Sequence, residues 1–214
     1  MQLGFGEFDV DYLTIKENYC VSWVSEDPES GIVKNEISVC SALGHNECLL
    51  HRLDVSNQTS HCIADLEFKE GVMYMAKIRT ENKAGLSTEL FSDGFIVDTT
   101  PPFMGEVTFI KSSKITEQET TETFIFSQIS VHWSGFWDKE SGIRTCYACV
   151  GTQQGECNIK NFTDTSNSTS FTFQDLPLDQ GEKYFVSVKA KNKAGLISDL
   201  KTSDAVVVDK TGKS

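Results

Sequence analysis

The two halves of this sequence repeat each other at a spacing of 110 residues. The segment Asn-Lys-Ala-Gly-Leu occurs unchanged at residues 82–86 and 192–196. Around each copy lie, in the same order, a tryptophan, an Asp-x-Glu-Ser-Gly-Ile segment, a Leu-x4-Gly-x2-Tyr block and a Val-Asp-x-Thr segment: Trp23 and Trp133, 27–32 and 138–143, 66–74 and 176–184, 97–100 and 208–211. A repeat of this length indicates two duplicated domains and excludes a solenoid.

The domain boundary is predicted at the segment Thr-Thr-Pro-Pro, residues 99–102. The first domain then comprises residues 1–100 and the second residues 101–214. Proline restricts its own backbone and that of the preceding residue, so we expect a short, stiff linker. The second domain has an extra stretch rich in Thr and Glu at residues 111–123, which we expect to be a disordered surface loop.

The chain is predicted to be all-β. Short segments alternate apolar and polar residues between turn residues, most clearly at Tyr74, Ala76, Ile78 and at Tyr184, Val186, Val188. This period of two indicates strands with one buried face, and no segment shows a convincing helical period. Short strands in a domain of about 100 residues favour an antiparallel β-sandwich.

Three of the repeated landmarks resemble those of fibronectin type III domains. They are the tryptophan on the second strand, the Leu-x4-Gly-x2-Tyr block before the sixth strand, and Asn-x2-Gly in the loop after it. The resemblance covers nearly the whole chain in two copies. It implies two immunoglobulin-like sandwiches with a core tryptophan and a tyrosine whose hydroxyl anchors a strand crossover. The cysteines and the Asp-x-Glu-Ser-Gly-Ile turn depart from the usual pattern and indicate a divergent subgroup.

Six of the seven cysteines are assigned to three disulfides. Cys40 and Cys48 enclose seven residues, as do Cys149 and Cys157, so a hairpin can bring each pair together. In the fibronectin-like arrangement the second and fifth strands are neighbours, and strand parity points Cys20 and Cys62 outward, which predicts a surface bridge. The second domain has Ser130 and Thr172 at those two positions.

Cys146 is left unpaired, and its counterpart along the sequence is Ile37. We expect a buried free thiol. The alternatives are an intermolecular bridge, which would produce an oligomer, and an exposed reactive thiol. The spacing Cys146-x-x-Cys149 matches redox motifs, but those need a helix N-terminus and this pair lies within a predicted strand.

Composition indicates an extracellular or cell-surface location. Seven cysteines occur together with three N-glycosylation sequons, at Asn57, Asn161 and Asn167. The net charge of −12 argues against nucleic acid or anionic lipid as a partner, because both require a basic surface.

Two candidate sites lie near the turn that follows the second strand of the second domain. Asp98, Asp138 and Glu140 could converge and hold a calcium ion through carboxylate oxygens. The preferred alternative is that Asp138 and Ser141 hydrogen-bond the backbone of a tight turn, and no other cofactor is expected. Phe136 and Trp137 flank the same turn. Trp137 either packs against Phe103 and Met104 to fix the interdomain angle or contacts a partner.

No set of catalytic residues is found, so we do not expect an enzyme. The leading hypothesis is a non-catalytic adhesion or recognition fragment of a larger cell-surface or secreted protein that binds another protein. The second is a structural spacer in a longer array of modules. The third is a cytokine-receptor-like pair, which ranks last because residues 198–208 contain no tryptophan for the Trp-Ser-x-Trp-Ser motif of those receptors.

Overall fold

The computed structural model describes residues 2–3, 10–14, 18–43, 47–110 and 127–208. The chain divides into two compact units, residues 1–100 and 101–214, and each is treated on its own below. The secondary structure of the described residues is entirely β, and none of them forms a helix of the length and hydropathy that a membrane span requires. The predicted loop at 111–123 and residues 209–211 of the second Val-Asp-x-Thr segment lie outside the described residues.

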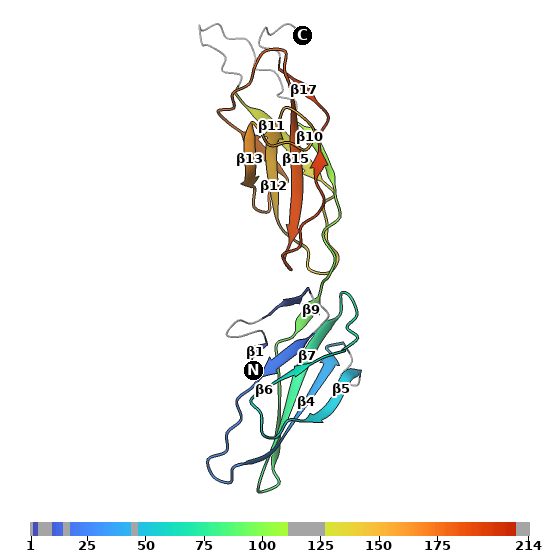
Figure 1. Ribbon diagram of the computed structural model, residues 1–214, viewed down its shortest axis with the longest axis vertical. Helices are drawn as coiled ribbons and strands as arrows, with labels where there is room; N and C mark the ends of the chain where they lie inside the picture. Colours follow the sequence, from blue (N-terminus) through green and yellow to red (C-terminus); the bar gives the residue numbers. More distant parts are fainter. Residues whose placement is uncertain (1, 4–9, 15–17, 44–46, 111–126, 209–214) are drawn as a thin grey trace. The chain divides into compact units, whose positions relative to one another are not determined.

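The first unit is a sandwich of a small sheet and a large sheet (Figure 1). The small sheet has the order β1-β3-β6, with bounds Gln2–Leu3, Tyr19–Ser22 and Ser60–Ile63. The large sheet has the order β2-β9-β7-β4-β5, and β8 also pairs with β7. These strands span Tyr12–Leu13, Phe95–Val97, Met73–Asn82, Ile32–Ser41, Cys48–Asp54 and, for β8, Ser87–Phe91.

The second unit repeats this arrangement with fewer strands. Its small sheet has the order β10-β11-β14, with bounds Glu106–Phe109, Ile129–Ser134 and Ser170–Phe173. Its large sheet has the order β13-β12-β15-β16, with bounds Lys160–Asp164, Ile143–Gly151, Lys183–Asn192 and Lys201–Thr202. A short strand β17, Val206–Val207, pairs with the start of β15.

The repeated landmarks form the core of each unit. Trp23 and Trp133 are buried, and alternate residues of β7 and β15 are buried beside them, as the period of two predicts. The hydroxyl of Tyr74 accepts a hydrogen bond from the N–H of Lys69 at 3.0 Å. The hydroxyl of Tyr184 accepts one from the N–H of Asp179 at 2.8 Å, so both tyrosines anchor the crossover before their own strand.

The structure corrects the predicted counterpart of Cys146. Cys146 in β12 pairs with Ala190 in β15, which corresponds to Thr80 in β7. Thr80 pairs with Asn35, so the counterpart of Cys146 is Asn35 and not Ile37. The structural alignment of β12 with β4 is therefore shifted by two residues from the alignment that the sequence suggested. A shift of two keeps the same side chains on the buried face, so the apolar pattern does not reveal it.

The same shift affects Cys149, the disulfide-bonded cysteine of β12. Cys149 pairs with Ser187, which corresponds to Lys77 in the first unit. Lys77 pairs with Ser38, so Cys149 occupies the place of Ser38 and not that of Cys40. The Cys40–Cys48 and Cys149–Cys157 bridges have the same spacing in the sequence, but their positions along the third strand differ.

Candidate functional site

In the first unit, hydrogen bonds join the Asp-x-Glu-Ser-Gly-Ile turn at residues 27–32 to the Asn-Lys-Ala-Gly-Leu turn at residues 82–86. The Oδ1 atom of Asp27 accepts hydrogen bonds from the N–H groups of Glu29 and Ser30, at 3.0 and 2.8 Å. Its Oδ2 atom accepts one from the Nδ2 of Asn82 at 2.8 Å. Asn82 then accepts the N–H of Leu86 through Oδ1, also at 2.8 Å. We call this Asp–Asn pair and its turn bonds the clasp.

The second unit has the same clasp. Asp138 accepts the N–H groups of Ser141 and Gly142 at 2.9 and 3.1 Å, and the Nδ2 of Asn192 at 3.0 Å. Asn192 accepts the N–H of Leu196 at 2.7 Å. In each unit the clasp thus joins the turn after the second strand to the turn after the sixth. This shared role explains why both motifs are the same in the two copies.

Asp27 is ionised over the whole physiological range of pH. The N–H of Ser30, followed by the Asn82 amide, lowers the pKa of this carboxyl to about 2. Hydrogen bonds to the charged form of an acid favour that form. The clasp in the first unit is therefore charge-assisted, and it depends on the carboxylate remaining deprotonated.

The three residues predicted to bind calcium belong to two different units. Asp98 is fully buried in the first, where it accepts the N–H of Thr100 at 3.2 Å. Asp138 makes the turn bonds described above, including a bond from the hydroxyl of Ser141 at 3.3 Å, and Glu140 is half-buried. These are the turn bonds that the preferred alternative requires. Calcium binding by Asp98, Asp138 and Glu140 stays a prediction.

The structure contains all three of the expected bridges: Cys20–Cys62, Cys40–Cys48 and Cys149–Cys157. Cys20 and Cys62 lie directly opposite each other on β3 and β6. In the second unit Ser130 and Thr172 also lie opposite each other, and their hydroxyl oxygens are 2.9 Å apart. A hydrogen bond thus takes the place of the disulfide.

Cys146 is free and buried in the core of the second unit. Burial raises the pKa of its thiol, while Trp133 acts in the opposite direction. A buried thiol with a raised pKa is a poor nucleophile and a poor partner for an intermolecular disulfide. The position therefore favours the packing role over the two alternatives.

The side chains of Asn57, Asn161 and Asn167 are all exposed. Asn57 and Asn167 lie in the same loop of their respective units, within the recurring pattern Asp-x-Ser-Asn-x-Thr-Ser at residues 54–60 and 164–170. In both loops the aspartate accepts the N–H of the serine two residues later. The 110-residue spacing between Asn57 and Asn167 is the sequence signal that predicts this shared turn.

The two aromatic residues predicted to contact a partner have different environments. Phe136 packs against the core of the second unit. Trp137 is 49% exposed and stacks on Phe103, which is 57% exposed, with ring centroids 4.5 Å apart and planes at 9°. The N–H of Phe103 donates to the carbonyl of Trp137 at 2.9 Å, and the neighbouring Met104 is also exposed. We call Phe103, Met104 and Trp137 the aromatic patch.

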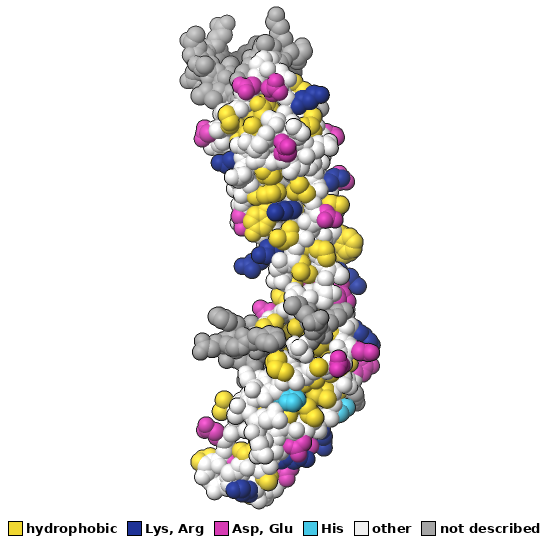
Figure 2. Space-filling view, viewed as in Figure 1, with side chains coloured by type: hydrophobic (Ala, Val, Ile, Leu, Met, Phe, Trp, Pro, Cys, Tyr) yellow, Lys and Arg dark blue, Asp and Glu magenta, His cyan; other side chains and the backbone are white. Residues whose placement is uncertain are grey.

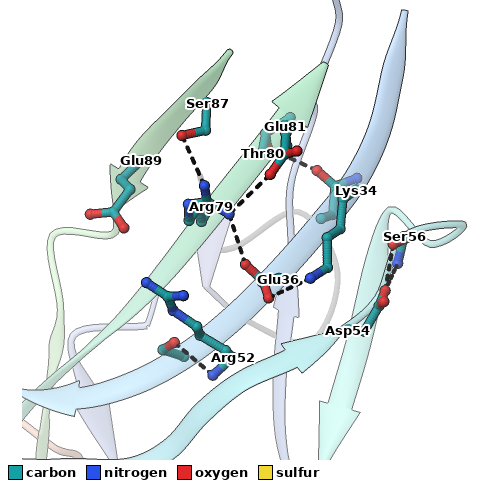
Figure 3. A network of polar contacts seen from close by, with 12 residues as sticks. Lys34, Glu36, Arg52, Asp54, Ser56, Arg79, Thr80, Glu81, Ser87 and Glu89 are labelled. Atoms are coloured by element: carbon teal, nitrogen blue, oxygen red, sulfur yellow. Dashed lines mark hydrogen bonds and ion pairs between the residues drawn. The ribbon is translucent and has the colours of Figure 1, made fainter. Parts of the chain in front are cut away.

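A network of charges on the first unit was not predicted from the sequence (Figure 3). Glu36 accepts the Nζ of Lys34 at 2.8 Å and a guanidinium nitrogen of Arg79 at 3.0 Å. Arg79 also reaches Glu81 at 3.3 Å and Ser87 at 3.0 Å. Lys34, followed by Arg79, lowers the pKa of Glu36. Lys34 and Glu36 are two residues apart on β4, whereas Arg79 comes from β7 and its partner Ser87 from β8, so the network joins three strands.

The pairing of strands decides the type of module. In each unit the first, second and fifth strands of the sandwich form one sheet and the others form the second, with a tyrosine hydroxyl at the crossover. Each unit therefore has the fold of a fibronectin type III module. In the first module one additional strand, β2, pairs in parallel with β9.

Comparisons with known proteins find only distant similarities, to solved structures. No family model and no curated protein matches the sequence. The FN1–FN3 domains of chicken CNTN1 are 16% identical, with a TM-score of 0.40, over 97% of this chain and 66% of theirs. The fibronectin(III)-like modules of Clostridium thermocellum CbhA are 12% identical, with a TM-score of 0.45, over 95% and 92%.

Proposed function

We propose that the chain is a non-catalytic extracellular recognition fragment that binds another protein. The aromatic patch carries this proposal. Two stacked aromatic rings that stay half exposed next to an exposed methionine offer a large, rigid apolar surface. Aromatic side chains of this kind are enriched at the energetic centres of protein interfaces.

The proposal includes N-glycosylation of the three exposed sequons in the secretory pathway. Three disulfides support an oxidising compartment, and an exposed asparagine in a turn is accessible to a glycosyltransferase. Secretion from animal cells, followed by enzymatic removal of N-glycans, should lower the mass in three steps. Substituting Asn57, Asn161 or Asn167 by Gln should remove one step each. A single unglycosylated species from such cells would contradict this part.

Binding is tested with labelled fragment on an array of extracellular proteins and on intact cells. Trp137→Ala should weaken any specific binding by about tenfold or more, as expected for an interface centre. Phe162→Ala is the matched control, because Phe162 is another exposed aromatic residue, 38% exposed, of the same module. Equal losses in both variants, or none in either, would remove the aromatic patch from the proposal.

The second candidate function is a structural spacer in a longer array. It is supported by the end of the first module, where Glu70 accepts hydrogen bonds from the N–H and the hydroxyl of Thr99, at 2.5 and 2.8 Å. These bonds hold the last residues before the Pro-Pro segment onto the module. A fragment that binds no protein or cell in the assay above would favour this function.

A further inference from the structure

A polar pocket of about 310 Å³ opens on the outer face of the large sheet of the second module. We call it the cationic pocket. Its lining consists of Arg144, Thr145, Tyr147, Asp164, Ser166 and Lys191. These residues belong to β12, to β15, and to β13 with the loop that follows it, and the three strands are neighbours in the sheet. The pocket therefore lies within a single module.

The pairing of the strands brings two basic residues into this pocket. Thr145 lies opposite Lys191 on β15, and Tyr147 lies opposite Asp164 on β13. The ladder between β12 and β15 is irregular at Arg144, which is an extra residue of β12, and extra residues of this kind often redirect a side chain. Arg144 is exposed and Lys191 is half-buried. Figure 2 shows basic side chains over the part of the module where Figure 1 draws β12 and β15.

The charges of Arg144 and Lys191 have no partner among the described residues of the chain, since neither side chain forms an ion pair there. The carboxylate of Asp164 instead accepts the hydroxyl of Thr145 at 2.5 Å and the N–H of Ser166 at 2.8 Å. These two bonds, followed by the charges of Arg144 and Lys191, lower the pKa of Asp164. Two cations and one anion give the pocket a net charge of +1. The donors of both cations are available to a ligand.

The first module has acidic residues where this pocket has none. By the pairing of the strands, three of its residues stand at the positions of Arg144, Tyr147 and Lys191, and in this order they are Val33, Glu36 and Glu81. Both glutamates bind Arg79 there, at 3.0 and 3.3 Å (Figure 3). The second module therefore replaces an internally paired face by one whose positive charges remain available.

We propose that the cationic pocket binds the carboxylate of an aspartate or glutamate side chain of the partner protein. Guanidinium and ammonium groups form strong, charge-assisted hydrogen bonds with carboxylates, and arginine can form two in parallel. A net charge of +1 matches a single carboxylate, whereas the net charge of −12 on the chain repels long polyanions. The inference deepens the proposed function and rests on it, because it names the group that the partner supplies.

The test titrates the whole secreted chain with blocked tripeptides. The probe is Leu-Asp-Leu, and Leu-Asn-Leu is the control of the same size without the charge. Isotope-labelled tyrosine gives five amide signals in NMR spectra, of which only that of Tyr147 comes from the pocket. We expect a saturable shift of this signal, with the acid bound about tenfold more tightly than the amide. Equal affinities, or an equal shift of Tyr74 in the first module, would overturn the proposal.

Three substitutions test whether Arg144 and Lys191 are the donors. Arg144→Gln and Lys191→Gln should each weaken binding of Leu-Asp-Leu by about fivefold or more. Lys191→Glu introduces the acid of the first module and should abolish binding. Lys183→Gln is the matched control, because it removes the same charge from an exposed position of the same strand outside the pocket. Equal losses in the control and the pocket variants would reflect only the net charge and would contradict the proposal.

A further titration distinguishes a protein carboxylate from that of a sugar. Free N-acetylneuraminate should bind more weakly than Leu-Asp-Leu. Tighter binding of the sugar would mean that the pocket takes an acidic glycan, and the proposal would be wrong.

The pocket and the aromatic patch can fail separately. Trp137→Ala should leave peptide binding unchanged, whereas Arg144→Gln should weaken binding of the whole chain to a partner found on the protein array. A partner whose binding requires Trp137 but neither Arg144 nor Lys191 would overturn this inference and leave the proposed function standing.

Discussion

The outer faces of the two large sheets use the same strand positions for different chemistry. In the first module Glu36 on β4 pairs with Arg79 on β7, within the network of ion pairs. In the second module Tyr147 and Lys189 occupy these two positions. The Nζ of Lys189 lies 4.1 Å from the ring centroid of Phe162. An ion-pair face and a cation–aromatic face are thus built on one fold.

The inner faces and the turns differ much less. Each module keeps its tryptophan, its tyrosine corner and its clasp, because these residues pack the core or accept hydrogen bonds from the backbone of the turns. Figure 2 shows acidic and basic side chains interspersed over the visible surface of both modules. The repeat thus preserves the core and turn residues that each module needs in order to fold, while the residues on the outer face of the large sheet differ between the modules.

The largest expected effect comes from exchanging the bridge between β3 and β6. Cys20→Ser with Cys62→Thr gives the first module the hydroxyl pair of the second. We expect the first module to lose about 2–4 kcal/mol of unfolding free energy, because the crosslink no longer restricts the unfolded chain. Denaturant unfolding of the whole chain measures this. Ser130→Ala with Thr172→Ala in the second module is the control, with a cost below about 1.5 kcal/mol.

The next effect tests whether the two clasps are equivalent. Asn82→Ala and Asn192→Ala each remove one donor to an aspartate and one acceptor from the next turn. Each should cost about 1–3 kcal/mol, and the two costs should be similar. Lys83→Ala, which alters the neighbouring side chain of the same loop, should cost less than about 0.5 kcal/mol. Unequal costs for the two asparagines would mean that the clasps contribute differently.

A net effect smaller than that of the clasp variants should follow from exchanging both residues of the buried pair beside the clasp. Asn35 accepts the hydroxyl of Thr80 at 2.8 Å in the first module, where the second has Cys146 and Ala190. Cys146→Asn alone should destabilise the second module by about 1–3 kcal/mol, because the amide is buried without its hydroxyl partner. Adding Ala190→Thr should recover part of that loss. A double-mutant cycle with no coupling would contradict the corrected register.

The smallest effect is a dependence of stability on pH that arises from the clasp of the first module. The pKa of Asp27 falls from its ordinary value of 3.8 to about 2 on folding. Since the folded value is the lower one, this stabilisation is fully present above about pH 4 and is lost as the pH falls towards 2. Asp27→Asn should therefore flatten the pH dependence of the melting temperature of the first module between pH 5 and 2. An unchanged slope would show that Asp27 contributes nothing to it.

Most of the fold could be predicted because local patterns constrain it strongly. The 110-residue repeat defined two domains, and alternation along 74–78 and 184–188 defined strands with one buried face. Parity alone placed Cys20 and Cys62 outward. These features could be predicted because each depends on residues close in sequence, or on the period of two that the strands of any sandwich must satisfy.

The sequence by itself determined the number of modules, their all-β class and the residues able to form disulfides. Only the tertiary structure decided how the repeat is registered in the third strand, since a shift of two residues leaves the period unchanged and is resolved only by the neighbouring strand. It likewise revealed that hydrogen bonds join the two repeated motifs of each module, and that Phe136 is packed while Trp137 is exposed. Each of these depends on groups far apart in the chain, whose proximity no local pattern records.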